Sequence, residues 1–130
     1  MCMMITLFGC AKDIKNITDF SKFSNMTQET DKIEVTYDNG SGTPFCFTIE
    51  NQSDIDEIMN IIFSSSFKNM GKGTNDGGHT TIVIIQGDDE YKMHVGSNKE
   101  GNNYYSFSTN DLQDKINELA REAGAYETVE

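Results

Sequence analysis

Tryptophan is absent from this chain of 130 residues, proline occurs once, and basic residues are scarce. Ten lysines and arginines stand against 21 acidic residues, so the formal net charge is -11 at pH 7. This balance argues against a nucleic-acid partner, because the phosphate backbone would repel such a surface, and we expect none. It also argues against adsorption to anionic lipid through a basic face. A basic protein partner is favoured electrostatically, although solubility alone is the simpler explanation of the charge.

Long hydrophobic runs and paired cysteines are also missing. No apolar stretch approaches the roughly 20 residues that a membrane-spanning helix needs. The three cysteines, Cys2, Cys10 and Cys46, do not form a disulfide framework. Cys46 lies in an expected strand with no histidine nearby in the sequence, so a structural thiol is a better interpretation than a nucleophile. The length leaves room for one domain.

Catalytic and cofactor-binding motifs are equally scarce. The chain contains no Gly-x-Ser-x-Gly elbow and no His-Glu-x-x-His pair. Gly71-Lys72-Gly73-Thr74 has the wrong spacing for a phosphate loop, and His79 and His94 lack a third well-spaced metal ligand. We therefore expect a protein that is not an enzyme and that uses no catalytic residue, metal site or cofactor.

The chain does contain an uncharged, mostly apolar stretch over residues 1–9 that ends at Cys10. Leu7-Phe8-Gly9-Cys10 resembles the lipobox of bacterial lipoproteins, with a leucine three residues before the cut and a small residue just before it. The resemblance implies that residues 1–9 are a truncated signal segment and that Cys10 carries the acyl chains, palmitate among them. The mature protein would then be anchored on the extracytoplasmic face of the cell membrane.

This signal segment departs from the usual pattern in two respects. It lacks a basic residue before the apolar stretch, and the stretch is short for a signal peptide. A true start codon further upstream would explain both departures. The alternative interpretation is that residues 3–8 form a buried N-terminal strand.

The segment after Cys10 differs in composition from the rest of the chain. Residues 10–31 are rich in serine, threonine, asparagine and lysine, and their apolar residues are too scattered for a firm periodicity. This composition predicts a flexible tether between the membrane and the domain. The domain itself is expected over residues 32–124, with a frayed tail over residues 125–130.

Alternating apolar and polar residues predict several strands in the domain. Residues 32–37 and 45–49 alternate strictly and are expected to form an antiparallel hairpin. Residues 80–85 are apolar on both faces, which is typical of a covered central strand. Further strands are expected over residues 91–95 and 104–107, separated by a polar loop over residues 97–103.

Two helices with one apolar stripe each complete the pattern. The first is capped by Ser53, and Phe67 and Met70 after it are expected to return to the core; the second begins near Asn110 and ends at Gly124. The resulting order, ββαβββα, predicts an α+β fold with two layers. It consists of one mainly antiparallel sheet of about five strands with both helices on one face. The stripes comprise Ile55, Ile58, Met59 and Ile62 in the first helix, and Leu112, Ile116, Leu119, Ala120 and Ala123 in the second.

Residues 32–123 also resemble a known group of proteins. Phe47-Thr48-Ile49 before the first helix, Phe67-Lys68-Asn69 after it, and the closing Tyr105-Ser106-Phe107 are similar to segments of small Gram-positive lipoproteins. Those proteins carry C-terminal domains of unknown function. The expected architecture is also similar to one repeat of the β-lactamase-inhibitory proteins, which bind enzymes through their sheet. That second likeness concerns the fold alone.

These observations predict a non-enzymatic, membrane-anchored lipoprotein that binds a protein or another envelope component through the open face of its sheet. Tyr104, Lys92 and His94 are the candidate contact residues, because an exposed tyrosine beside polar side chains is common at binding surfaces. The alternative is a cytoplasmic acidic inhibitor or immunity protein that masks a basic toxin or enzyme.

Overall fold

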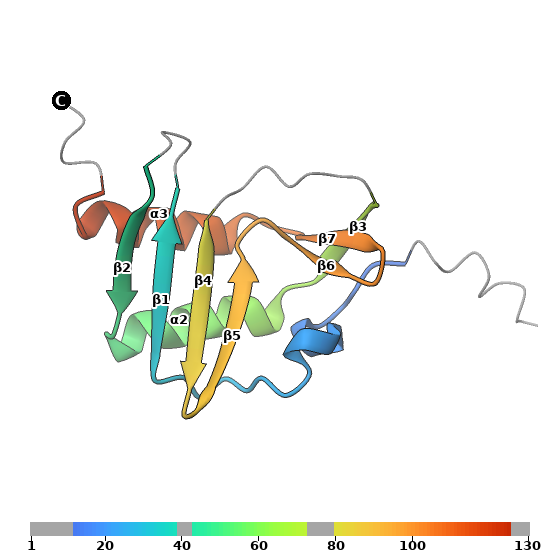
Figure 1. The fold of residues 1–130 in the computed structure, drawn as a ribbon, viewed down its shortest axis with the longest axis horizontal. Coiled ribbons are helices and arrows are strands. Elements are labelled where there is room, and N and C mark those ends of the chain that lie inside the picture. Colours follow the sequence, from blue (N-terminus) through green and yellow to red (C-terminus); the bar gives the residue numbers. More distant parts are fainter. Residues whose placement is uncertain (1–11, 39–42, 73–79, 126–130) are drawn as a thin grey trace, which may run out of the picture.

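The computed structural model describes residues 12–38, 43–72 and 80–125 (Figure 1). Two short 3-10 turns come first, η2 (Ile17–Asp19) and η3 (Ser21–Phe23). The helices and strands that follow are β1 (Lys32–Tyr37), β2 (Phe45–Ile49), α2 (Gln52–Ser64), β3 (Phe67–Gly71), β4 (Thr81–Gln86), β5 (Asp89–His94), β6 (Ser97–Glu100), β7 (Asn103–Phe107) and α3 (Asp111–Glu122).

Within these residues the strands form two antiparallel sheets. The larger has four strands in the order β2-β1-β4-β5, and the smaller has three in the order β3-β7-β6. The α+β class, the antiparallel pairing and the two helices are confirmed. The prediction of about five strands in one sheet is wrong, because two further strands are present and the chain divides between two sheets.

The four-stranded sheet and the helices form the predicted two layers. β1 and β2 make the expected hairpin, with Ile33 opposite Ile49, and β1 also pairs with β4. Both helices lie behind this sheet in Figure 1 and so cover the same face. Burial of this face provides the main hydrophobic contribution to the fold. Its fully buried side chains include Ile33, Val35, Ile82, Ile84 and Met93.

Each helix turns its predicted stripe to the core. Ile55, Ile58, Met59 and Ile62 of α2 are buried, as are Leu112, Ile116, Leu119 and Ala120 of α3, whereas Ala123 is exposed. The N-cap of α2 is Asn51 rather than Ser53, because the Asn51 side chain accepts a hydrogen bond from the Asp54 amide at 3.1 Å. Neither described helix is long and apolar enough to cross a membrane.

A largely buried lysine joins the two helices. The ammonium group of Lys115 lies 3.0 Å from a carboxylate oxygen of Glu57 and 3.2 Å from one of Asp54, and its side chain is only 10% exposed. The hydrogen bond to Glu57 is the largest influence and raises the pKa of Lys115, with a further contribution from Asp54 against the effect of burial. The charged form of this lysine therefore stabilises the packing of α2 against α3.

The small sheet contains the strands that the sequence pattern did not predict. β6 lies where a polar loop was expected, and it buries Ser97 and Asn98. The Asn98 side chain accepts a hydrogen bond from the His94 amide and donates one to the His94 carbonyl, both at 2.9 Å. It thus pairs with the end of β5 as a neighbouring strand would, and the chain leaves one sheet for the other at this point. Met70 of β3 is 45% exposed instead of returning to the core.

Residues 12–31 are not a tether but part of the folded body. Ile17, Phe20, Phe23 and Met26 are each at most 3% exposed. The Phe20 ring packs edge-on against Phe67 and Tyr105 of the small sheet, with centroids 5.2 and 5.9 Å away. These contacts bury four large apolar side chains that a solvated tether would leave in water, so the domain begins at or before Lys12.

Backbone hydrogen bonds fasten the same segment along its length. Ile14 forms an antiparallel bridge with Phe67. The Ile14 amide donates to the Phe67 carbonyl at 2.9 Å, and the Phe67 amide donates to the Ile14 carbonyl at 2.7 Å. At the other end, Asp31 receives a hydrogen bond from the Gly87 amide at 2.8 Å. Both ends of the segment are therefore fixed to the body.

The C-terminal boundary lies close to the predicted one. Gly124 has a φ of 103°, a left-handed conformation that ends α3. The Ala125 amide then donates to the Ala120 carbonyl at 2.9 Å, and Ala125 packs against the core. The ordered domain thus includes Ala125, and the rest of the predicted tail lies outside the described residues.

Candidate interaction surface

The four-stranded sheet has a second face, turned away from the helices. No described element lies over this open face in Figure 1. Side chains alternate along each strand, so the register identifies which of them share the face. They are Lys32, Glu34 and Thr36 of β1, Cys46 and Thr48 of β2, Thr81, Val83 and Ile85 of β4, and Glu90, Lys92 and His94 of β5.

A short apolar strip runs along the centre of the open face. Val83 and Ile85 are half-buried although no helix covers them, because neighbouring side chains on β1 and β5 shield their edges. The prediction that β4 is covered on both faces is therefore wrong. The strip is narrow, but it is available to a partner that can bury it.

Charged residues of both signs flank this strip. Glu34 and Lys92 are the cross-strand neighbours of Val83, and Lys32 and Glu90 are those of Ile85. Each apolar residue thus has an acidic neighbour on one side and a basic neighbour on the other, and the two signs change places between Val83 and Ile85. The open face is therefore close to neutral, although the protein as a whole is acidic. Alternating charges of this kind also stabilise a solvated sheet, and they do not by themselves identify a binding site.

The structure places two of the three predicted contact residues on the open face. Lys92 is exposed there, and His94 is half-buried opposite Thr81. Among the described residues His94 Nδ1 has no hydrogen-bond partner, although it is buried. Tyr104 lies instead on β7 in the small sheet, where the Lys99 ammonium group lies 5.8 Å from its ring centre. The three residues therefore do not belong to one sheet face.

Cys46 lies at the edge of the open face on β2. It is a free, exposed thiol, and its sulfur lies 3.9 Å from the Thr36 hydroxyl across the hairpin. Among the described residues, no histidine or charged side chain that would activate this thiol as a nucleophile is seen in contact with it. Its exposure makes it a convenient chemical probe of this face.

A polar groove of about 1030 Å³ is the other notable concavity, between α2, the β4–β5 turn and the segment before β1. Its walls are acidic, and they include Glu29, Asp31, Asp56 and Asp89. Two of its other residues maintain the fold: Gln86 accepts a hydrogen bond from the Thr27 amide at 3.1 Å, and Gly87 is bonded to Asp31. Across the described ranges no three metal-ligating side chains come together.

The lipobox and Cys10 lie outside the described residues, as does His79. Comparison of the chain with protein families, with curated sequences and with solved structures gave no match. The resemblances to Gram-positive lipoproteins and to β-lactamase-inhibitory proteins therefore remain predictions from the sequence.

Proposed function

We propose that this protein is a lipid-anchored, extracytoplasmic binding module. Cys10 would carry the acyl chains, and the open face of the four-stranded sheet would contact a protein partner. No catalytic step is assigned to the module. The observation that carries the proposal is the uncovered Val83–Ile85 strip, which lies in a sheet whose other face packs against the two helices.

The composition of the open face narrows the kind of partner that fits. The apolar strip gains free energy when a partner removes it from water, and the flanking Glu34 and Lys92 set the orientation of that partner. The acidic net charge would draw a basic protein toward the module, whereas the open face itself suits a partner of mixed charge. Lys92 and His94 remain candidate contacts, and Tyr104 belongs to another surface.

Photo-crosslinking from the open face tests this proposal. A maleimide-benzophenone attached to Cys46 reports on contacts at the face, and the same probe on a Glu118→Cys, Cys46→Ser variant reports on exposed α3. Cys2 is replaced by serine in both, and Cys10 is left to the cell. We expect a defined crosslinked protein from Cys46 in intact producing cells, and none from position 118.

A substitution within the strip supplies the matched control. Val83→Lys places a charge at the centre of the open face, and we expect it to abolish the crosslink while leaving far-UV circular dichroism unchanged. Val83→Ile keeps the strip apolar and should retain the crosslink. The proposal is wrong if both probe positions give the same products, or if Val83→Lys does not reduce the crosslink from Cys46.

A further inference from the structure

Basic residues are concentrated at one end of this acidic protein. The segments 12–23, 67–72 and 97–107 contain six of the ten basic residues of the chain but only three of its 21 acidic residues. The six are Lys12, Lys15, Lys22, Lys68, Lys72 and Lys99, and the three are Asp13, Asp19 and Glu100. This end is therefore positive, although the protein as a whole carries a formal charge of -11.

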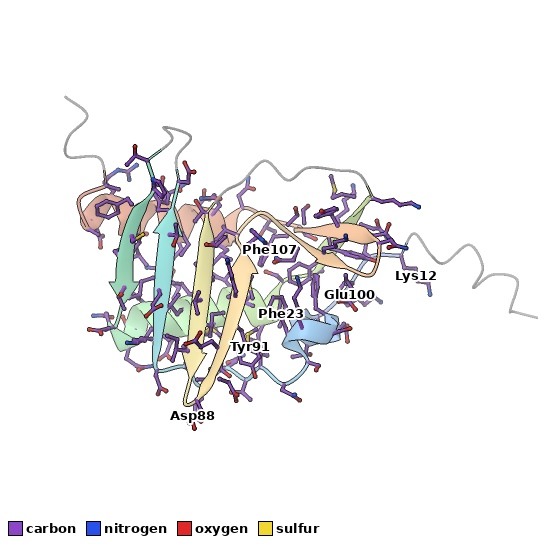
Figure 2. The ribbon with its side chains drawn as sticks, viewed as in Figure 1. Lys12, Phe23, Asp88, Tyr91, Glu100 and Phe107 are labelled. Atoms are coloured by element: carbon purple, nitrogen blue, oxygen red, sulfur yellow. The ribbon has the colours of Figure 1, made fainter. Side chains whose placement is uncertain are left out.

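The fold brings these three segments together. Ile14 bridges to Phe67 of β3, β3 pairs with β7, and β7 pairs with β6. Near the opposite edge, the Ser21 amide and hydroxyl both donate hydrogen bonds to the Glu100 carboxylate, at 3.0 and 2.6 Å. Figure 2 shows Lys12 at the same end of the molecule as Glu100, far from β2.

One face of the small sheet is packed and the other is basic. Phe67 and Tyr105 point to the buried side, so the residues that alternate with them point outward. Lys68 and Lys99 are exposed on the outward side. Tyr104 of the central strand β7 lies on the same side, directly opposite Lys99 of β6. Lys15 and Asp13 flank the inward Ile14 and are both exposed, and the Asp13 carboxylate accepts a hydrogen bond from the Asn69 amide at 2.8 Å. We call this outward set, Lys15, Lys68, Lys99 and Tyr104, the lysine face.

The segment that bridges to the small sheet at Ile14 begins close to the proposed site of acylation. Only Ala11 separates Cys10 from Lys12, so their Cα atoms are at most about 7 Å apart. Residues 12–31 are packed into the body, so no long tether within the described part of the chain holds this end away from a bilayer. Lys12 would therefore lie within about one Debye length, roughly 8 Å at physiological ionic strength, of an anchored Cys10.

We propose that the lysine face rests on the anionic phospholipid headgroups around the anchor and so orients the lipoprotein on the membrane. This inference rests on the proposed anchoring at Cys10. The rest of the chain contains four basic and 18 acidic residues, so, apart from the nearly neutral open face, it would be repelled by the same headgroups, and the charge distribution favours one orientation. The open face of the four-stranded sheet then remains accessible to a partner.

Two less polar side chains at this end also suit a membrane surface. Tyr104 is half-buried with an amphipathic ring, and aromatic side chains of this kind prefer the headgroup region. Met70 is 45% exposed at the irregularity where β3 shifts register against β7. A nucleic acid or an acidic protein would also match the lysines, but neither accounts for the less polar side chains at this end.

Lysine acylation on tethered protein tests the orientation. A full-length Cys2→Ser, Cys46→Ser variant leaves Cys10 as the single thiol, which couples to a maleimide phospholipid. The vesicles consist either of phosphatidylcholine alone or of phosphatidylcholine with phosphatidylglycerol. Brief treatment with an N-hydroxysuccinimide ester, followed by mass spectrometry, gives the modification rate of each lysine relative to untethered protein.

We expect Lys15, Lys68 and Lys99 to react about fivefold more slowly on the anionic vesicles than on phosphatidylcholine, with the difference lost at high salt. Lys32 and Lys92 on the open face are the internal controls and should react equally on both. A Lys15→Gln, Lys68→Gln, Lys99→Gln variant should lose the preferred orientation. Its limited-proteolysis pattern should then be the same on anionic vesicles and on phosphatidylcholine vesicles. A Lys32→Gln, Lys92→Gln variant should keep it.

Equal protection of all lysines, or equal rates on the two lipids, would overturn the inference. Protection of Lys32 and Lys92 instead of the lysine face would overturn it as well. The tether is made chemically, so these outcomes do not depend on acylation in the cell. Failure of the proposed anchoring would be seen separately, as the absence of an acylated form of the native protein.

Discussion

Replacing Phe20 by alanine is the sharpest test of the packed N-terminal segment. The Phe20 side chain is completely buried, and its ring contacts those of Phe23, Phe67 and Tyr105 with centroid distances of 5.2 to 5.9 Å. Removing a buried phenylalanine ring costs about 3–5 kcal/mol, through the lost burial and the cavity that remains. The surrounding rings belong to separate elements, so we expect little collapse and a value near the upper end of this range.

Urea unfolding followed by far-UV circular dichroism measures this loss. Domains of this size have free energies of unfolding of about 5–15 kcal/mol, so Phe20→Ala should shift the midpoint strongly at an unchanged slope. Phe20→Leu should cost about 1–2 kcal/mol, because most of the buried volume is kept. Ser24→Ala is the control, since Ser24 is exposed in the same segment. A cost of less than about 0.5 kcal/mol for Phe20→Ala would show that residues 12–31 are a tether after all.

Three further predictions concern the corner between the sheets, the helix pair and the open face. Asn98→Ala should lower the free energy of unfolding by about 2–3 kcal/mol, because the His94 amide and carbonyl both lose their partner, whereas exposed Asn102→Ala should change it little. An unchanged urea midpoint for Asn98→Ala would contradict this account of the corner. The pKa of Lys115 is raised above its ordinary 10.5, so its contribution to stability is complete below that pH and is lost as the pH rises through the folded-state pKa. We therefore expect the free energy of unfolding, measured by urea titration, to fall less between neutral and alkaline pH in Lys115→Met than in the wild type. Identical pH profiles for the wild type and the variant would contradict this role of Lys115. Cys46 should react with Ellman's reagent in the folded Cys2→Ser, Cys10→Ser protein as fast as in urea, because the thiol is exposed; strong protection would show that the face is covered.

The regular part of the fold could be predicted from sequence because its burial follows simple periods. β1 and β2 alternate, and the stripe of α2 recurs every three or four residues, so burial against one layer leaves a clear pattern. The small sheet leaves no such pattern. β6 contains two buried polar residues: the Asn98 side chain bonds to the His94 backbone, whereas the buried Ser97 hydroxyl has no hydrogen-bond partner among the described residues. A pattern of apolar residues cannot reveal a strand of this kind.

The packed N-terminal segment did leave a signal, but of an unusual period. Its buried side chains recur every third residue from Ile17 through Phe20 and Phe23 to Met26, and half-buried Ile14 continues the series. Three residues per turn is the period of a 3-10 helix, and η2 and η3 are two such turns. A period of three matches neither the 3.6 of an α-helix nor the 2 of a strand. The series therefore looks scattered, and the prediction of a flexible tether was wrong.

The candidate surface could be predicted only in part, because the division into two sheets decides which residues share a face. Lys92 and His94 follow from the alternation in β5. Tyr104 has the correct alternation, but β7 pairs with β3 and β6 instead of extending the large sheet. The grouping of lysines at one end was likewise hidden, because it depends on the bridge between Ile14 and Phe67.

The intact mass of the native protein, extracted from its own cells, tests the central claim most directly. The account predicts a chain that begins at Cys10 and carries the added mass of diacylglycerol. An unmodified chain that begins at Met1 would contradict the anchor. It would also favour the alternative of an acidic cytoplasmic inhibitor.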